Sequence, residues 1–227
     1  MRWSDRYPCL DDRRDIQPFD SHYVYHTAWA ARILAHTKPV LHVDISSYLY
    51  FATLVSAFIP VEYYDYRPAD IWLSNYRSNH SDLTNLPFGD ETVNSLSCMH
   101  VVEHIGLGRY GDPVDPSGDL RAMSELKRVL APGGTLLLVV PVGEPKVMFN
   151  AHRIYSYRQV AECFSDLHLG EFTLIPDSRE GEPVITNAAE ETADAQRYGC
   201  GCFRFIKPET PDFSIPPDES GGKGRSK

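Results

Sequence analysis

Blocks of apolar and polar positions follow one another along this chain in the order expected of alternating strands and helices. Two near-continuous apolar runs, at residues 39–45 (PVLHVDI) and 135–140 (TLLLVV), are typical of parallel strands buried on both faces. Between residues 119 and 130 the apolar side chains recur at helical spacing, and the turn at 131–134 (APGG) ends that helix. With a strand at 95–100, this stretch predicts a βαβ unit, whose functional loops lie at the carboxyl ends of its strands.

The remaining segments complete a doubly wound α/β sheet. A helix is expected at 19–36, with Asp20 or Ser21 as its N-cap, and another at 48–58 after the first strand. The other expected elements are strands at 61–65, 81–83 and 171–176, a helix that begins after Ser156, and a final strand at 200–207.

Composition narrows the class of protein. The 227 residues are enough for one α/β domain, and 42% hydrophobic residues are enough for its core. A formal net charge of −9, with scattered lysine and arginine, argues against a nucleic-acid partner. No apolar run approaches the roughly 20 residues of a membrane span, and the N-terminus lacks the apolar segment of a signal peptide. Five cysteines without a framework pattern indicate reduced thiols, so a cytoplasmic location is expected.

Two acidic residues stand at successive strand ends near the start of the predicted sheet. Asp44 ends the first strand and Asp65 ends the second, about 20 residues later, which is the spacing found in dinucleotide-binding folds. A carboxylate at the tip of the second strand suits a ribose diol because its oxygens accept two hydrogen bonds. The pair indicates a nucleoside cofactor, although either acid alone is also what a turn or a helix cap requires.

The second half of the chain resembles the class I S-adenosylmethionine (SAM)-dependent methyltransferases. The likeness is carried by LPFGDETVNSLSCMHVVEH at 86–104 and ELKRVLAPGGTLLLVVP at 125–141. The extension HVVEHIGLGRYGDPVDPSGDL at 100–120 resembles one branch of that superfamily, the DUF268-type proteins, which we associate with surface-polysaccharide and glycosylation contexts. The resemblance implies a Rossmann-like α/β fold with a seven-stranded, mainly parallel sheet, an antiparallel last strand and helices on both faces.

The resemblance covers roughly residues 7–207 and divides the chain into three parts. Residues 1–38 are expected to form an N-terminal segment and a helix that closes over the cofactor site. Residues 39–207 form the methyltransferase-like domain, in which the polar segment 177–199 is an insertion or lid. Residues 208–227 are rich in proline, glycine, serine and charge and are expected to be a disordered tail.

The resemblance also implies which residues hold SAM. In the family, an acid and a glycine-rich turn follow the first strand, so that the backbone approaches the cofactor closely. Here Asp44 occupies the acid position, and Ser46 replaces the first glycine. An acid after the third strand is expected to face the adenine. The expected cofactor-binding residues are Asp44, Ser46, Ser47, Asp65, Tyr66, Asp82, Leu83 and His100.

The loops after the fourth and fifth strands carry the expected acceptor chemistry. Methyl transfer to oxygen benefits from a base with a pKa near working pH, which favours histidine. His104 and His152 are the candidates, and Glu103 is expected to orient a histidine or a substrate hydroxyl. The residues expected to contact the acceptor are Arg109, Tyr110 and Tyr25. For Tyr25, packing of the first helix on the sheet is the alternative.

The histidines permit a second interpretation. The residues His100, Glu103, His104 and His152 resemble the metal ligands of catechol-type methyltransferases, in which a divalent ion lowers the pKa of the acceptor hydroxyl. The first ligand is a histidine here instead of an acid, so no metal is expected, and His100 is alternatively a buried strand-end histidine. Cys200 and Cys202 have one residue between them and no second pair, which does not match a zinc motif.

Three functions remain for this sequence. The preferred one is a SAM-dependent O-methyltransferase of polysaccharide biosynthesis, with a small-molecule or glycan acceptor that carries a sugar hydroxyl. The second is a catalytically impaired or regulatory SAM-binding domain, because Ser46 replaces the usual glycine. The third is an NAD-dependent sugar-modifying enzyme, which the missing G-x-G-x-x-G motif disfavours. The sequence determines neither the acceptor nor the oligomeric state.

Overall fold

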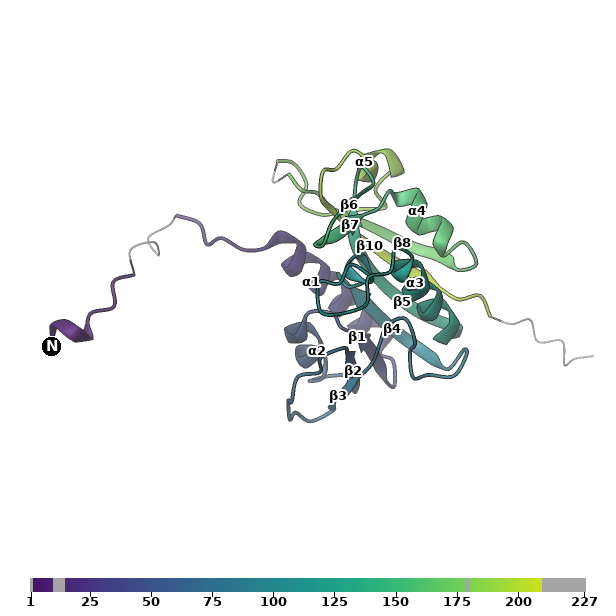
Figure 1. The fold of residues 1–227 in the computed structure, drawn as a ribbon, viewed down its shortest axis with the longest axis horizontal. Helices are drawn as coiled ribbons and strands as arrows, with labels where there is room; N and C mark the ends of the chain where they lie inside the picture. The colour runs from purple at the N-terminus through teal and green to yellow at the C-terminus, as the bar shows by residue number, and fades with distance from the viewer. Residues whose placement is uncertain (1, 10–14, 179, 210–227) are drawn as a thin grey trace, which may run out of the picture.

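The computed structural model describes residues 2–9, 15–178 and 180–209. Its centre is a sheet with the strand order β3-β2-β1-β4-β5-β10-β8-β9 (Figure 1). The strands of this sheet are β1 (His42–Ile45), β2 (Val61–Asp65), β3 (Tyr76–His80), β4 (Val93–Met99), β5 (Leu130–Val142), β8 (His168–Ile175), β9 (Ile185–Thr186) and β10 (Gly199–Ile206). A separate hairpin pairs β6 (Lys146–Met148) with β7 (His152–Ile154).

The directions of the strands confirm a mainly parallel sheet with an antiparallel last strand. β1 runs parallel to β2 and β4, β2 runs parallel to β3, and β4 runs parallel to β5. β10 is antiparallel to both β5 and β8. The two-residue β9 adds an eighth strand at the edge, beyond the seven of the expected fold. The carboxyl ends of β1, β2, β4 and β5 therefore meet at one edge of the sheet.

Helices cover both faces of this sheet (Figure 1). The helices are η1 (Trp3–Asp5), α1 (Ser21–Thr37), α2 (Leu49–Val55), η2 (Val102–His104), α3 (Gly118–Val129), α4 (Tyr157–Cys163) and α5 (Glu190–Asp194). One buried cluster joins α1 and α2 to the sheet through Ala30, Leu34, Phe51 and Val55. The opposite cluster holds α3 and α4 through Met123, Leu126, Val160 and Phe164. The two hydrophobic clusters therefore bury the central strands on both faces of the sheet.

Local sequence signals account for the helix ends. The Asp20 side chain accepts a hydrogen bond from the Tyr23 backbone N–H at 3.2 Å and caps α1, as expected. Ser156 and Gln159 form a capping box at the start of α4, which confirms the predicted cap. Helix α3 ends at Val129, and Leu130 then pairs with Val93 of β4. Residues 131–134 form a bulge, and pairing with β4 resumes at Thr135. The expected turn is therefore a bulge inside β5.

The third strand is the one element that the sequence pattern placed wrongly. It was expected at residues 81–83, but β3 occupies Tyr76–His80 and pairs with β2 in parallel register. β3 is an edge strand in which only Tyr76 is buried, so its sequence YRSNH has no apolar run for a pattern to detect. Residues 81–83 instead follow β3 as the loop at the functional edge of the sheet.

The segments outside the central sheet differ in how far they are described. Within 177–199, β9 pairs with β8, α5 contacts α4, and Asp177 accepts hydrogen bonds from the backbone of Arg197 and Tyr198. The predicted tail, apart from residues 208 and 209, lies outside the described residues. Among the helices of the described ranges, none combines the length and apolar character that crossing a membrane requires.

Candidate functional site

The turn after β1 adopts the conformation that a glycine usually supplies. Ser46 has a φ of +53°, in the left-handed region that residues with a Cβ rarely adopt. Two hydrogen bonds to the Tyr64 carbonyl fix this conformation, from the Ser46 backbone N–H at 2.8 Å and from its Oγ at 3.1 Å. Ser46 therefore keeps the bend that a glycine usually supplies at such a turn.

Asp44 lies beneath this turn and not in front of it. Its side chain is fully buried, accepts a hydrogen bond from the Ser47 backbone N–H at 3.1 Å and accepts another from the Ser97 hydroxyl. Burial raises the pKa of the Asp44 carboxyl to about 6. Asp44 lines neither of the cavities described below, so its carboxylate braces the turn in this structure, and the expected contact with the cofactor stays a prediction.

Asp65 ends β2 at the mouth of a cavity of about 390 Å³. One carboxylate oxygen accepts from the Tyr63 hydroxyl at 3.0 Å, and the other accepts from the Arg67 backbone N–H at 2.7 Å. These bonds fix the direction of the carboxylate. The cavity is also lined by other residues expected at the cofactor, namely Ser46, Tyr66, Asp82, Leu83 and His100.

The loop after η2 forms the opposite wall of this first cavity. The Arg67 guanidinium lies 4.9 Å from the centre of the Tyr110 ring, so the loop contacts the segment after β2. Gly106 has a φ of +78°, and a Cβ there would lie 2.1 Å from the Asp115 carbonyl oxygen. Glycine at 106 is therefore required for the loop to fold back on itself and close the cavity.

A second cavity, of about 460 Å³, adjoins the first. Four residues line both cavities: Ser46, His100, His104 and Tyr110. The expected Ser47, Glu103, Arg109 and His152 line the second cavity. Tyr25 lines neither one; its ring packs against Phe19 and against the core under α1, which is the packing role that was its alternative.

Glu103 connects two histidines in the second cavity. Its Oε1 accepts a hydrogen bond from His100 Nδ1 at 2.9 Å and lies 3.8 Å from His104 Nε2. Its side chain is 1% exposed, and its Oε2 has no hydrogen-bond partner among the described residues. A buried carboxylate in this position orients one imidazole and stabilises positive charge on the other.

The proton on His104 is fixed by its backbone contact. His104 Nδ1 lies 2.6 Å from the Ala151 carbonyl oxygen, which only accepts, and 3.2 Å from Arg109 Nη1, which donates to the same carbonyl at 3.0 Å, so Nδ1 carries the hydrogen. His104 Nε2 is therefore the basic nitrogen, beside Glu103 and at the boundary of the two cavities. This tautomer is the one that a general base needs.

His152 faces His104 across the second cavity. The two ring centres lie 6.5 Å apart, and the His152 ring lies 4.9 Å from that of Tyr198. Partial burial lowers the pKa of His152, and the neighbouring Arg109 guanidinium lowers it further. His152 is therefore a second imidazole that lines this cavity.

A buried polar cluster holds the β6–β7 hairpin, and with it His152, against the site. Arg153 Nε lies 3.3 Å from Asp119 Oδ2, which also accepts a hydrogen bond from the Tyr155 hydroxyl at 3.0 Å. The same guanidinium donates to the Ile105 carbonyl at 2.7 Å. The cluster thus links β7 to α3 and to the end of η2.

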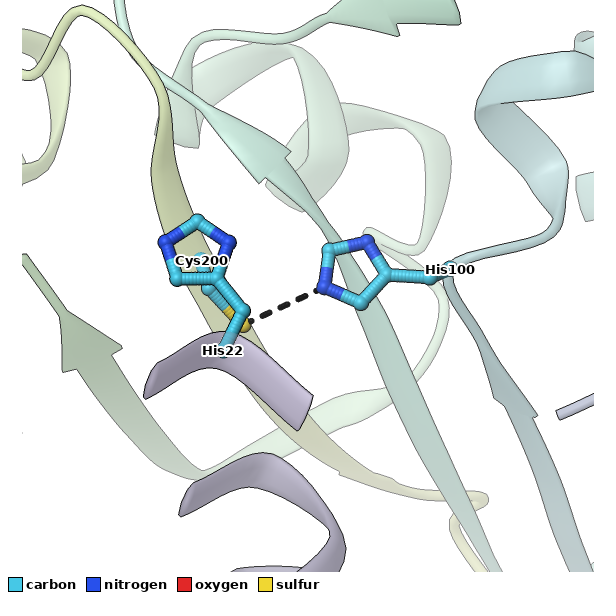
Figure 2. A group of neighbouring side chains, drawn as sticks. All are labelled: His22, His100 and Cys200. Carbon is cyan, nitrogen blue, oxygen red and sulfur yellow. Dashed lines mark hydrogen bonds between the residues drawn. The ribbon is translucent and has the colours of Figure 1, made fainter. Parts of the chain in front are cut away.

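The metal ligands considered from the sequence do not converge. Among the described residues, the one group of metal-binding side chains whose ligand atoms come together is His22, His100 and Cys200, within 4.8 Å of one another. Figure 2 shows the three side chains converging from α1, the end of β4 and β10. Of the four residues considered as alternative ligands, only His100 belongs to this group.

Several residues of the second cavity were not found from the sequence. They are Asp20, His22 and Tyr198. The first two lie at the start of α1 and the last precedes β10, so only the folded chain brings them together. Neither periodicity nor spacing carries a signal for a contact of this kind.

Comparison with protein-family models identifies the chain. Residues 62–175, half of the chain, match the family described as "Caenorhabditis protein of unknown function, DUF268". The chain belongs to this family. The DUF268 match spans β2 to β8 and includes Asp65, Glu103, His104 and His152. No curated protein sequence matches the chain.

Solved structures share the fold of this DUF268 protein at low sequence identity. One is a Burkholderia thailandensis 1,6-didemethyltoxoflavin-N1-methyltransferase with bound S-adenosylhomocysteine (TM-score 0.58, 13% identity, 82% of this chain and 79% of that one). Another is the YcgJ protein of Bacillus subtilis (TM-score 0.55, 15% identity, 81% of this chain and 100% of that one). A third is the [4+2]-cyclase SpnF (TM-score 0.53, 14% identity, 81% of this chain and 82% of that one). At these identities the similarity establishes the Rossmann-like methyltransferase fold.

Proposed function

We propose that this DUF268 protein is a SAM-dependent O-methyltransferase whose acceptor is a hydroxyl group of a sugar or glycoconjugate. The observation that carries the proposal is the position of His104 in the wall shared by two cavities. One cavity presents Asp65 at the tip of β2, and the other is lined by Glu103 and His152. A cofactor and an acceptor in these cavities would meet beside the basic nitrogen.

The first cavity fits the nucleoside part of SAM. Its volume of about 390 Å³ lies in the range of small-molecule sites. A carboxylate has about four acceptor positions, and Tyr63 and Arg67 each use one on Asp65, so a ribose diol can take two more. Asp82 and Leu83 would hold the adenine, and Ser46 and Ser47 the amino-acid end. When bound, SAM supplies an electrophilic methyl group on its sulfonium centre.

The acceptor's proton has a defined destination. A hydroxyl in the second cavity gives its proton to His104 Nε2, because Nδ1–H is held by the Ala151 carbonyl. The imidazolium that forms faces Glu103 Oε1 at 3.8 Å, and the buried carboxylate stabilises its charge. Placement of the hydroxyl in this cavity and removal of its proton are the two contributions of the chain to the reaction.

The lining of the second cavity suits a hydroxyl-rich acceptor. Charged and hydroxyl-bearing side chains surround it, and these donate and accept hydrogen bonds in several directions. The side chains that would make these contacts are Asp20, Tyr23, Glu103, Arg109, Tyr110, His152 and Tyr198. A small-molecule or glycan acceptor fits this lining better than a nucleic acid, because the chain carries a net charge of −9.

A regulatory or catalytically impaired SAM-binding domain is the second candidate. Two observations favour it: Ser46 stands in the position of the family's glycine, and the [4+2]-cyclase SpnF shares the fold. A shared fold does not fix the reaction, which depends on the residues of the site. The second candidate predicts cofactor binding without methyl transfer.

Methyl transfer from SAM with a labelled methyl group tests the proposal. Sugars, nucleotide sugars and oligosaccharides are offered as acceptors, and amines of similar size serve as controls. We expect label in a methyl ether of a sugar and no label in the amines. Label in the amines alone would contradict O-methylation. Binding of S-adenosylhomocysteine (SAH) without transfer to any acceptor would favour the regulatory domain.

A further inference from the structure

We propose that His22, His100 and Cys200 bind a thiophilic divalent transition metal of the zinc type. The three side chains come from α1, from the residue after β4 and from β10, and their ligand atoms lie within 4.8 Å of one another (Figure 2). The metal proposal does not rest on the proposed methyl transfer, because binding of the ion can be measured without SAM or an acceptor.

The spacing of the ligand atoms suits a tetrahedral ion. Zinc binds imidazole nitrogen at about 2.0–2.1 Å and thiolate sulfur at about 2.3 Å, which separates its ligand atoms by about 3.3–3.6 Å. His100 Nε2 and Cys200 Sγ already lie 3.5 Å apart. The His22 ligand atom lies within 4.8 Å of both, so it needs to approach by at most about 1.5 Å to reach the same separation.

A second, independent observation supports the site: the orientation of His100. Its Nδ1 donates to Glu103 Oε1 at 2.9 Å, so Nε2 carries the lone pair and points at Cys200 Sγ. A carboxylate behind a ligating histidine fixes its tautomer and strengthens it as a ligand, as in established zinc sites. Glu103 is therefore a positioning residue for the metal ligand.

The ligand set selects the class of ion. Two imidazoles and a thiolate suit zinc and its neighbours, whereas magnesium and calcium take oxygen ligands. Three protein ligands leave the fourth tetrahedral position open, as in catalytic zinc sites. His22 and His100 both line the 460 Å³ cavity, so the open position faces that cavity and suits water or an oxygen of its occupant.

The backbone of His100 and the positions of the His22 ring and the Cys200 thiol are compatible with a shared metal ion. His100 has a φ of +57°, a conformation that holds its side chain at the end of β4 through a backbone bond from its N–H to the Val139 carbonyl at 2.8 Å. Its ring lies parallel to that of His22, with centres 5.9 Å apart and an interplanar angle of 2°. Cys200 is fully buried between them and Cys202, whose Sγ lies 4.0 Å away.

Titration of the chelator-stripped protein with Zn²⁺ alone tests the proposal. All measurements use a Cys9→Ser background, because the Cys9 thiol is exposed. We expect one tightly bound Zn²⁺ per chain, which excess Mg²⁺ does not displace. Cys200→Ser and His22→Asn should each weaken binding at least about a hundredfold, and Glu103→Gln about tenfold to a hundredfold. The matched controls Cys163→Ser on α4 and His36→Asn on α1 should bind as the background protein does.

Two results would overturn the metal site. One is the absence of stoichiometric Zn²⁺ binding at about 100 μM. The other is unchanged affinity in both Cys200→Ser and His22→Asn. Should these variants fail to fold, Co²⁺ bound to the background protein decides, because a thiolate ligand produces a sulfur-to-cobalt absorption band. The band supports the site, and its absence contradicts it.

Discussion

His104 Nε2 lies 3.8 Å from Glu103 Oε1, in the wall between the two cavities. His104→Ala removes the base and is expected to slow methyl transfer by about 10²–10⁴-fold, while SAH binds as before. Glu103→Gln keeps the size of the side chain, removes its charge and slows the same step. The measurement is the initial rate with labelled SAM, with the exposed His36→Ala as control. A wild-type rate in His104→Ala would assign the base elsewhere, with His152 next in reach.

The ion pair between Arg153 and Asp119 holds the β6–β7 hairpin against the site. Breaking it is expected to lower the free energy of unfolding strongly. Arg153→Met leaves the buried Asp119 carboxylate without its guanidinium, which costs about 3–5 kcal/mol in the free energy of unfolding. Urea denaturation measures the loss. The matched control is Arg158→Met, which removes an exposed ion pair with Glu162 and should leave the midpoint unchanged. Equal effects of the two substitutions would contradict this role.

The buried His42 should make the protein less stable in acid. Burial lowers the pKa of His42 to about 3, from an unfolded value of 6.5, and both ring nitrogens lie within 3 Å of the serine hydroxyls at 95 and 97. The unfolded chain therefore binds the proton first, and stability falls as pH drops below 6.5. His42→Gln should reduce the loss between pH 7.5 and 4.5 by roughly 2–3 kcal/mol.

Urea denaturation at the two pH values checks this effect, and the exposed His36→Gln is the control. Asp44 contributes with the opposite sign, because its pKa is raised to about 6 and its stabilising effect is present at low pH and lost as pH rises. An identical pH dependence in His42→Gln and His36→Gln would contradict the buried neutral imidazole.

Ser46 separates the two candidate functions. Ser46→Gly relieves the left-handed strain of about 1–2 kcal/mol and loses a hydrogen bond worth about 0.5–1.5 kcal/mol, so stability should change by less than about 1 kcal/mol. Since serine already holds the bend of the turn, affinity for SAH should stay within about threefold. Calorimetry measures it. A gain of tenfold or more would indicate that serine impairs the cofactor turn, in favour of the regulatory domain.

Much of the fold follows from the sequence because its central elements are buried on one or two faces. β5 and α3 carry apolar patterns that only a buried strand and an amphipathic helix explain. β3 escapes the same reasoning because it is the third strand along the chain but lies at the edge of the sheet, with Tyr76 as its single buried residue. An edge strand needs few apolar side chains.

The candidate site likewise contains residues that the sequence could place and residues that it could not. Asp65, Ser46 and His104 stand at or just after strand ends, so the topology of a parallel sheet alone directs them to one edge. The sequence could not show that the Asp44 side chain is buried beneath the turn after β1, because an acid at a strand end has the same sequence pattern whether it is buried or exposed. His22, on α1, and Cys200, on β10, meet His100 only in the folded chain, a contact without local signal.

Asp65 is expected to carry much of the cofactor affinity. Asp65→Ala removes the acceptor of two ribose hydrogen bonds, a loss of about 2–4 kcal/mol or about 30- to 1,000-fold in the affinity for SAH. The fold should tolerate the change, because the Tyr63 hydroxyl keeps a second contact with the Ser47 carbonyl at 3.3 Å. Asp70→Ala, an exposed acid outside both cavities, is the matched control. Equal SAH affinity in the two variants would remove Asp65 from the cofactor site.

Calorimetric titration of the folded wild-type protein with SAM and with SAH measures cofactor binding itself. We expect one site per chain with a dissociation constant of about 1–100 μM for SAH, and competition between the two ligands. The absence of binding by either ligand at about 1 mM would exclude SAM as the cofactor.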